Sequence, residues 1–263
     1  MQYPTISEYV KASQDASDNL DMSTEATKAE LNEAITDEFG VKYSKDGRKL
    51  LKAPKELRRG YSVKEGTRII CNHAFSHSSL SNIVIPDSVT DIGDYAFSDC
   101  SSLTNIVIPN SVTDIGDYAF WECSSLTNIV IPDSVTDIGN SAFEYCSSLS
   151  NIVISNSVTD IGDGAFAYCS FLSNIVIPDS VTDIGSSAFL GCSSLVKIVI
   201  PDSVTDIGSS AFEYCSSLSK IVIPDSVTNI GNGAFHGCSL SYDFKQELIS
   251  RFGKEIFNDL WYL

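Results

Sequence analysis

A step of 23 residues runs through most of the chain and limits the folds that the chain can adopt. Seven consecutive units of this length start at Leu80 and end at Leu240, and one of them reads LTNIVIPNSVTDIGDYAFWECSS. The phenylalanines that recur at this step are Phe97, Phe120, Phe143, Phe166, Phe189, Phe212 and Phe235. A unit this short cannot bury its apolar side alone, so neighbouring units must stack. The sequence therefore predicts a repeat solenoid over 80–240.

Within one unit, apolar residues alternate in the way that a short strand requires. Ile106 and Ile108 point to one side of the strand and Val107 points to the other. Pro109 ends the strand, because it has no N–H to donate to a neighbouring strand. A second short extended piece follows, and Gly116 then permits a sharp corner. Each unit therefore forms one coil with an apolar interior.

The repeated pattern L-x-x-I-x-I-P-x-S-V-x-x-I-G-x-x-A-F-x-x-C-S-S is similar to that of the BspA-like leucine-rich repeat family of bacterial and protist proteins. The resemblance covers 80–240. It implies a right-handed leucine-rich-repeat solenoid with a parallel β-sheet on one face. It also implies roles in surface adhesion or protein interaction, and no enzyme activity.

The segment before the repeats is predicted to contain helices and a cap. Residues 1–40 form a helical N-terminal segment in this prediction. One helix starts at a capping box of Thr5 and Glu8, and a second carries Leu31, Ile35 and Phe39 on one face. Residues 41–79 are expected to form a cap hairpin around an Asp-Gly turn, followed by a degenerate first coil.

The segment after the repeats, 241–263, is predicted to be a C-terminal capping helix. Asp243 and Gln246 suit the start of this helix. The apolar residues expected on its inner face are Phe244, Leu248, Ile249, Phe252, Ile256 and Phe257. Such a helix would cover the open side of the last coil.

The negative charge of the chain is concentrated in the repeats. The whole sequence has a net charge of −17, and residues 80–240 hold 18 acidic residues against only Lys197 and Lys220. Such a surface repels the phosphates of nucleic acids and anionic lipids, so neither is expected as a partner. No apolar run reaches the roughly 18 residues of a membrane-spanning helix, so no membrane insertion is expected.

The start of the chain bears on its location. Residues 1–8 lack the basic and apolar regions of a signal peptide, which indicates a cytoplasmic protein. A chain trimmed of its leader would look the same, so a cell-surface or secreted location is the alternative. We expect the chain to be a monomer.

Eight cysteines raise the question of disulfides or metal ligands. Seven of them, from Cys100 to Cys238, occupy one position in consecutive coils and are expected to point inward. A row of parallel thiols does not give convergent ligands, so we predict buried free thiols and no metal site. Cys71, His73 and His77 are the one local group with ligand-like spacing, and a fourth ligand is missing. No cofactor-binding loop occurs, and no cofactor is expected.

One row of aspartates also recurs through the coils. Its members are Asp91, Asp114, Asp137, Asp160, Asp183 and Asp206. Short polar residues at turns commonly bond to nearby backbone N–H groups, which explains the row without a ligand. A calcium-binding row is the alternative, although the Gly-rich repeat of calcium-binding β-rolls is absent.

Two outward rows are candidate binding sites. The first is the valine between the two inward isoleucines of each coil, with asparagines beside it. The second is formed by aromatic residues at variable positions before the cysteine, and variable positions on a fixed frame often carry specificity in repeat proteins. The predicted binding residues are Val107, Val130, Val153 and Val176 with Asn128 and Asn151, and Trp121, Tyr145 and Tyr168. β-Propensity explains the valines equally well, and scattered surface packing explains the aromatic residues.

These features favour a non-catalytic module that binds a protein partner through one face of the solenoid. A structural spacer without its own ligand is one alternative. A surface adhesin that binds a host protein or a glycan is another, with Trp121 and the tyrosines as stacking platforms. An enzyme is not expected, because no nucleophile, acid–base pair or cofactor loop converges in the sequence.

Overall fold

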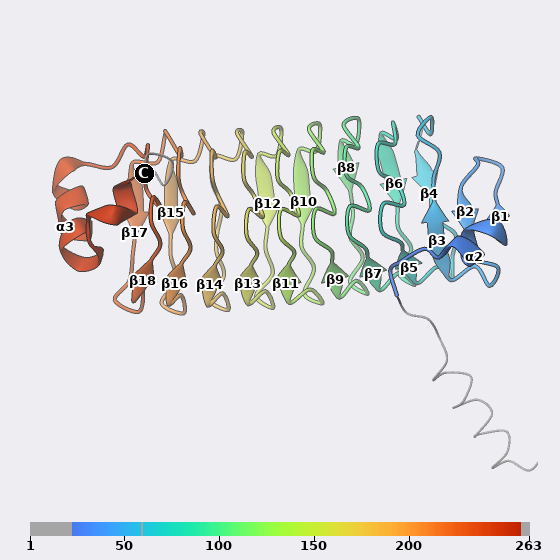
Figure 1. The fold of residues 1–263 in the computed structure, drawn as a ribbon, viewed down its shortest axis with the longest axis horizontal. Helices are drawn as coiled ribbons and strands as arrows, with labels where there is room; N and C mark the ends of the chain where they lie inside the picture. Colours follow the sequence, from blue (N-terminus) through green and yellow to red (C-terminus); the bar gives the residue numbers. More distant parts are fainter. Residues whose placement is uncertain (1–22, 59, 259–263) are drawn as a thin grey trace, which may run out of the picture.

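A computed structural model of the chain describes residues 23–58 and 60–258, and these residues form a rod of stacked coils (Figure 1). The parallel leucine-rich-repeat solenoid predicted from the sequence is confirmed. The helix predicted from Thr5 lies outside the described residues. One end of the rod carries a hairpin with a short helix, and the other end carries helix α3 (Figure 1).

Two sheets run along the rod, where the resemblance implied a sheet on one face. The longer sheet has eleven strands: β1 (Ile35–Thr36), β2 (Lys42–Tyr43), β3 (Lys49–Lys52), β5 (Ile69–Ile70), β7 (Asp91–Ile92), β9 (Asp114–Ile115), β11 (Asp137–Ile138), β13 (Asp160–Ile161), β14 (Asp183–Ile184), β16 (Asp206–Ile207) and β18 (Asn229–Ile230). The other sheet has a five-stranded part and a two-stranded part: β4 (Tyr61–Ser62), β6 (Asn82–Val84), β8 (Asn105–Ile106), β10 (Asn128–Val130) and β12 (Asn151–Val153), and then β15 (Lys197–Val199) and β17 (Lys220–Val222). The second extended piece of each coil thus pairs more continuously than the first.

Neighbouring coils pair in register, so that identical side chains lie on one another. Asp137 and Ile138 of β11 pair with Asp160 and Ile161 of β13. In the interior, this register stacks the phenylalanine rings from Phe75 to Phe235, with centroids 5.1–5.6 Å apart and planes 1–17° from parallel. Every ring in this stack is fully buried. The core is therefore one continuous column along the rod.

A third side of each coil is a turn that bonds to the following coil. The N–H of Tyr118 donates to the carbonyl oxygen of Asn140 at 2.8 Å, and the N–H of Glu122 donates to that of Glu144 at 2.9 Å. Both donors have a left-handed backbone, with φ of 56° at Tyr118 and at Glu122. Residues other than glycine adopt this conformation at a cost in free energy. The conformation nevertheless recurs at two positions of each coil, so we attribute it to the stacking of the coils and not to the local sequence.

The corner glycine that recurs in the coils has a different role from the one predicted. The backbone of Gly116 and Gly139 is not left-handed; both glycines are absent from the positive-φ residues of the described chain. A Cβ atom on Gly139 would instead lie 2.8 Å from the backbone of Gly116 and of Ile115. The glycine is required because successive coils approach backbone to backbone.

The cysteine row lies in the core, as the sequence predicts. All eight cysteines are buried and none forms a disulfide. From Cys100 onward, each thiol donates to the carbonyl oxygen of a phenylalanine in the preceding coil. Cys123, for example, donates to Phe97 at a Sγ–O distance of 3.1 Å.

We expect these thiols to be protected in the folded protein. A thiol-specific reagent should label few or none of the eight at pH 8 before denaturation, and all of them in denaturant, because only an exposed thiolate reacts. Counting labelled cysteines by mass spectrometry in both states checks this. Rapid labelling of most cysteines without denaturant would contradict the buried row.

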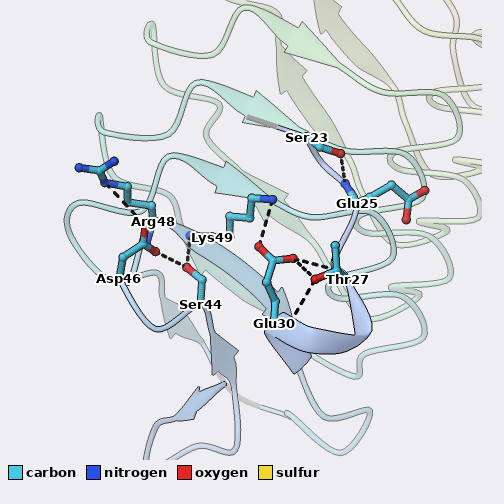
Figure 2. Close-up of polar contacts among 8 residues, drawn as sticks. All are labelled: Ser23, Glu25, Thr27, Glu30, Ser44, Asp46, Arg48 and Lys49. Atoms are coloured by element: carbon cyan, nitrogen blue, oxygen red, sulfur yellow. Dashed lines mark hydrogen bonds and ion pairs between the residues drawn. The ribbon is translucent and has the colours of Figure 1, made fainter. Parts of the chain in front are cut away.

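A partly buried ion pair lies near the N-terminal end of the rod (Figure 2). Helix α2 (Lys28–Asn32) starts with a capping box of Thr27 and Glu30. Glu30 also reaches Lys49 of β3, with 3.2 Å between Oε1 and Nζ, and the Lys49 side chain is only 5% exposed. Burial alone would raise the pKa of Glu30, but bonds from Thr27 and Lys49 lower it below its ordinary value.

The helix predicted to carry Leu31, Ile35 and Phe39 on one face is wrong in its second half. Ile35–Thr36 forms β1, which pairs antiparallel with Lys42–Tyr43 of β2. The helical spacing of these apolar residues does not decide their structure here. As a strand, the segment gains hydrogen bonds from β2, and this tertiary pairing outweighs the local preference. The β2–β3 pair is antiparallel and turns at Gly47, whose φ is 77°.

The C-terminal cap has two parts in place of the single helix expected. Helix α3 (Tyr242–Phe252) begins at Ser241 as its N-cap residue, not at Asp243, and the 3-10 helix η1 (Lys254–Phe257) follows. The N–H groups of Gly233 and Phe235 donate to η1, to the carbonyl oxygens of Glu255 and Ile256. η1 therefore accepts the hydrogen bonds that the turn of a further coil would accept from the last coil. Among the described residues, no helix is long and apolar enough to cross a membrane.

Candidate binding surfaces

The valine of each strand is exposed in all seven coils, and we name these residues the valine row. Their exposed fractions range from 48% to 73%. The row consists of Val84, Val107, Val130, Val153, Val176, Val199 and Val222. By contrast, Ile129 and Ile131, on either side of Val130, are 2% and 1% exposed. The strand thus divides its side chains between the core and an apolar outer surface.

Strand pairing brings only some of the predicted binding residues into one register. Val130 pairs with Val153, and Asn128 pairs with Asn151. Val107 follows the end of β8, which runs only to Ile106. Val130 and Val153 are therefore the best-defined centre of the row.

The sheet that carries the valine row is interrupted at the fifth coil. Residues 174–177, which the structure describes, form no strand. One isolated bridge joins Asn174 to Lys197 of β15. A cavity of about 300 Å³ opens there, lined by residues that include Ile175, Val176 and Val199. Lys197 and Asp179 also line this cavity, so a cation and a carboxylate are adjacent to its apolar side chains.

The predicted aromatic residues form a separate row on the turn side of the coils. The rings of Trp121 and Tyr145 meet edge to face with centroids 6.4 Å apart. The rings of Tyr145 and Tyr168 stack at 4.6 Å, and their residues are 40% and 37% exposed. Because these residues lie on the turn and the valines on a strand, the nine predicted binding residues belong to two surfaces.

The ligand-like group Cys71, His73 and His77 does not converge. Cys71 is buried beside Leu51. The imidazole of His73 stacks on another ring in the next coil, and His77 pairs through Nδ1 with Asp99 Oδ2 at 2.8 Å. In the described part of the chain, no three His, Cys, Asp or Glu side chains form a group that could hold a metal ion.

The sequence profile of the BspA type leucine rich repeat region, in six copies, matches residues 68–196 and 183–263. The chain belongs to this family. The match thus begins within the first, degenerate coil and extends into the C-terminal segment.

Solved structures of other leucine-rich-repeat proteins resemble the chain. A leucine rich repeat protein of T. pallidum is 26% identical, with 86% of this chain and 95% of that chain covered and a TM-score of 0.54. One from Eubacterium ventriosum is 24% identical over 80% of this chain and 50% of that chain, with a TM-score of 0.57. A leucine rich cell surface protein of Faecalibacterium prausnitzii is 29% identical over 62% of this chain, with a TM-score of 0.42, and the chain spans 59% of its length. No curated protein gives a significant match.

The BspA-type repeats of this chain carry a second aromatic stack that the sequence interpretation missed. His73, Tyr95 and Tyr118 stack in three successive coils, with centroid distances of 4.8 and 4.6 Å. The signal was present in the sequence, because the next units have Ser141 and Gly164 at the same position. A change of residue type within a strict repeat marks a place where the surface changes.

The acidic residues form two rows with different bonds. In the row that starts at Asp91, each carboxylate accepts from the hydroxyl of the preceding threonine, as Asp137 Oδ2 does from Thr136 at 2.6 Å. The sequence predicts bonds from backbone N–H groups to this row. A second row, which includes Asp94, Asp117 and Asp163, accepts such bonds instead. There, Oδ1 of Asp94 accepts from the N–H of Asp117 in the next coil at 2.9 Å.

Proposed function

We propose that the chain is a non-catalytic protein-interaction module that binds a partner through the valine row. The observation that carries the proposal is an apolar side chain, about half exposed or more, at one position in all seven coils. Apolar patches of a few hundred Å² on the surface of monomeric proteins are often functional, and the row of seven valines covers on the order of 300 Å². Membership of a leucine-rich-repeat family supports an interaction role over a catalytic one.

The charge beside the valine row indicates the chemistry of the partner. Asn128 and Asn151 border the row in the middle of the rod, whereas Lys197 and Lys220 border it further along. These lysines are exposed and are the only lysine or arginine residues of 80–240. We infer a partner segment with apolar side chains against the valines and acidic side chains toward the lysines, since complementary charge fixes orientation.

The absence of catalysis, the monomeric state and the location belong to the same proposal. All the thiols are buried, and the carboxylates of the aspartate row are held by threonine hydroxyls, so neither set is arranged as a nucleophile with a base. The cytoplasmic and surface locations both stay predictions. Glycan binding by Trp121, Tyr145 and Tyr168 also stays a prediction, on a face other than the valine row.

Replacing Val130 and Val153 with lysine tests the proposal. Neither side chain fills the core, so the fold should remain, while two charges would be placed within the proposed interface. We expect at least a tenfold loss of affinity for a partner purified with the wild-type chain, measured by titration calorimetry, because a buried unpaired charge opposes association.

The matched control is Thr136→Lys with Thr159→Lys, which adds the same charge at exposed positions directly before β11 and β13 of the longer sheet. This variant should retain the affinity of the wild type. If the valine variant binds as well as the control, the valine row is not the site, and the row of Trp121 and Tyr145 becomes the better candidate.

A further inference from the structure

The turn side of the rod contains a groove that begins where the stack of His73, Tyr95 and Tyr118 ends. Its volume is about 450 Å³. Ser141, Gly164 and Ser187 line it at the position that Tyr118 occupies one coil earlier. Because their side chains are small, the space taken by a ring in the second coil is open in the following coils.

Tyr118 therefore presents one covered and one open ring face. Its covered face lies against Tyr95 at 4.6 Å, with the planes 4° apart. In the described chain, no further ring stacks on the other side, where Ser141 follows. A planar group placed there at the same spacing would continue the stack.

The backbone does not explain the choice of tyrosine at this position. Tyr118 has a left-handed φ of 56°, and Ser141 and Ser187 have 50° and 56° in the same row. An aromatic side chain gains nothing from this conformation, and glycine also occurs in the row, at Gly164. The ring is thus retained for what its faces contact.

The walls of the groove are acidic and in part held rigidly. Asp117 and Asp163 form one wall, and Oδ1 of each accepts from the next coil's backbone, at 2.7 Å from Asn140 N and 2.6 Å from Ser186 N. Within the described residues, Asp163 Oδ2 accepts no hydrogen bond. Glu144 also lines the groove, and no basic side chain does.

We propose that this groove binds an arginine side chain of a protein partner. A guanidinium group is planar, stacks on aromatic rings and donates to carboxylates. It would lie on the open face of Tyr118, at the level of the coil between those of Asp117 and Asp163, where both carboxylates attract its charge. The proposal rests on the proposed function in that the ligand belongs to a protein, but it concerns the turn side and not the valine row.

The test uses the full chain and three short capped peptides that differ only at one central residue: arginine, lysine or citrulline, flanked by glycines. Chemical shifts in ¹H–¹⁵N spectra report the site and the affinity. We expect the arginine peptide to shift Tyr118, Ser141 and Gly164. We expect the neutral citrulline peptide, which has nearly the same shape, to bind at least tenfold more weakly.

Two variants remove the site without removing the fold. Tyr118→Ser introduces the residue that Ser141 already provides in this row. Asp117→Asn with Asp163→Asn keeps the bonds from the backbone of the next coil, because Asn140 Oδ1 already accepts such a bond from the N–H of Asp163 at 2.9 Å. Each should weaken the arginine peptide at least fivefold.

Asp183→Asn with Asp206→Asn is the control, since it changes the net charge equally on the longer sheet, where Asn229 is the natural residue of the last coil. It should leave the affinity unchanged. Equal weakening by both double variants, or equal binding of the lysine and arginine peptides, would overturn the proposal in favour of diffuse attraction. Shifts at Tyr118 with methyl glucoside but not with the arginine peptide would overturn it in favour of a sugar.

The two proposals fail independently. Val130→Lys with Val153→Lys should not change the affinity for the arginine peptide. Loss of peptide binding in the valine variant would indicate a damaged fold, and normal peptide binding with normal partner binding would reject the valine row alone.

Discussion

The solenoid should lose stability steeply above pH 9 and unfold cooperatively near pH 10. Burial raises the pKa of Cys100, Cys192 and Cys238 from 9.0 to about 12, and it raises those of the four thiols between Cys100 and Cys238 that complete the row in the same direction. In the unfolded chain these thiols ionise at their ordinary pKa.

The sign follows from the protons that each state holds. Below pH 9 both states keep the thiols protonated, and the folded state has its full stability. Above pH 9 the unfolded chain releases protons that the folded chain retains, so the free energy of unfolding falls by about 1.4 kcal/mol per thiol and pH unit. Seven thiols together lower it by on the order of 10 kcal/mol in one unit, which is comparable with the whole stability of a typical domain.

Urea unfolding followed by circular dichroism at pH 8, 9 and 10 measures this slope. A Cys146→Ala variant should be less stable at every pH but should have a slope smaller by about one proton. Equal stability of the wild type at pH 8 and pH 10 would show that the thiols are not held protonated.

Phe143→Ala should destabilise the protein by about 3–5 kcal/mol, the range for removing a fully buried aromatic ring. Phe143 has no exposed surface and stacks between Phe120 at 5.3 Å and Phe166 at 5.5 Å. The rigid spacing of the coils prevents the cavity from closing. Urea unfolding at pH 7 measures the change.

Phe171→Ser provides the matched control, because Phe171 is 67% exposed and the neighbouring units have Ser148 and Ser194 at this position. It should change the free energy of unfolding by less than about 0.5 kcal/mol. A loss for Phe143→Ala no larger than that of the control would mean that the phenylalanine column does not hold the coils together. If Phe143→Ala unfolds in separate transitions for the two halves of the rod where the wild type unfolds in one, the intact column couples the halves.

The coil and its core could be predicted from the sequence because each inward position repeats and stacking is the only way to bury it. The longer, eleven-stranded sheet was less apparent, since each of its strands in the coils is a two-residue Asp-Ile or related pair, too short for a pattern of its own. The left-handed tyrosines were missed for a different reason. Glycine, asparagine and aspartate are the usual residues in this conformation, so Tyr118 gives no local sign of it.

Two features depend on neighbours rather than on local sequence. Residues 128–131 and 174–177 have the same sequence, Asn-Ile-Val-Ile, yet only the first contributes a strand, β10. The groove beyond Tyr118 likewise needs a tyrosine in one coil and a serine in the next. Reading each unit by itself could identify the candidate valines and aromatic residues, but not which of them meet.

The common register of the coils has a consequence for how the array can evolve. Since each coil presents the same backbone donors and acceptors to both sides, gain or loss of a whole 23-residue unit by unequal recombination recreates junctions that already exist in the rod. The valine row would lengthen or shorten by about 4.8 Å per unit. The groove behaves differently, because it occurs where units with tyrosine give way to units with serine or glycine. Duplication of units on either side would move this boundary along the rod and still leave one groove, so the number of coils and the number of arginine sites can change independently.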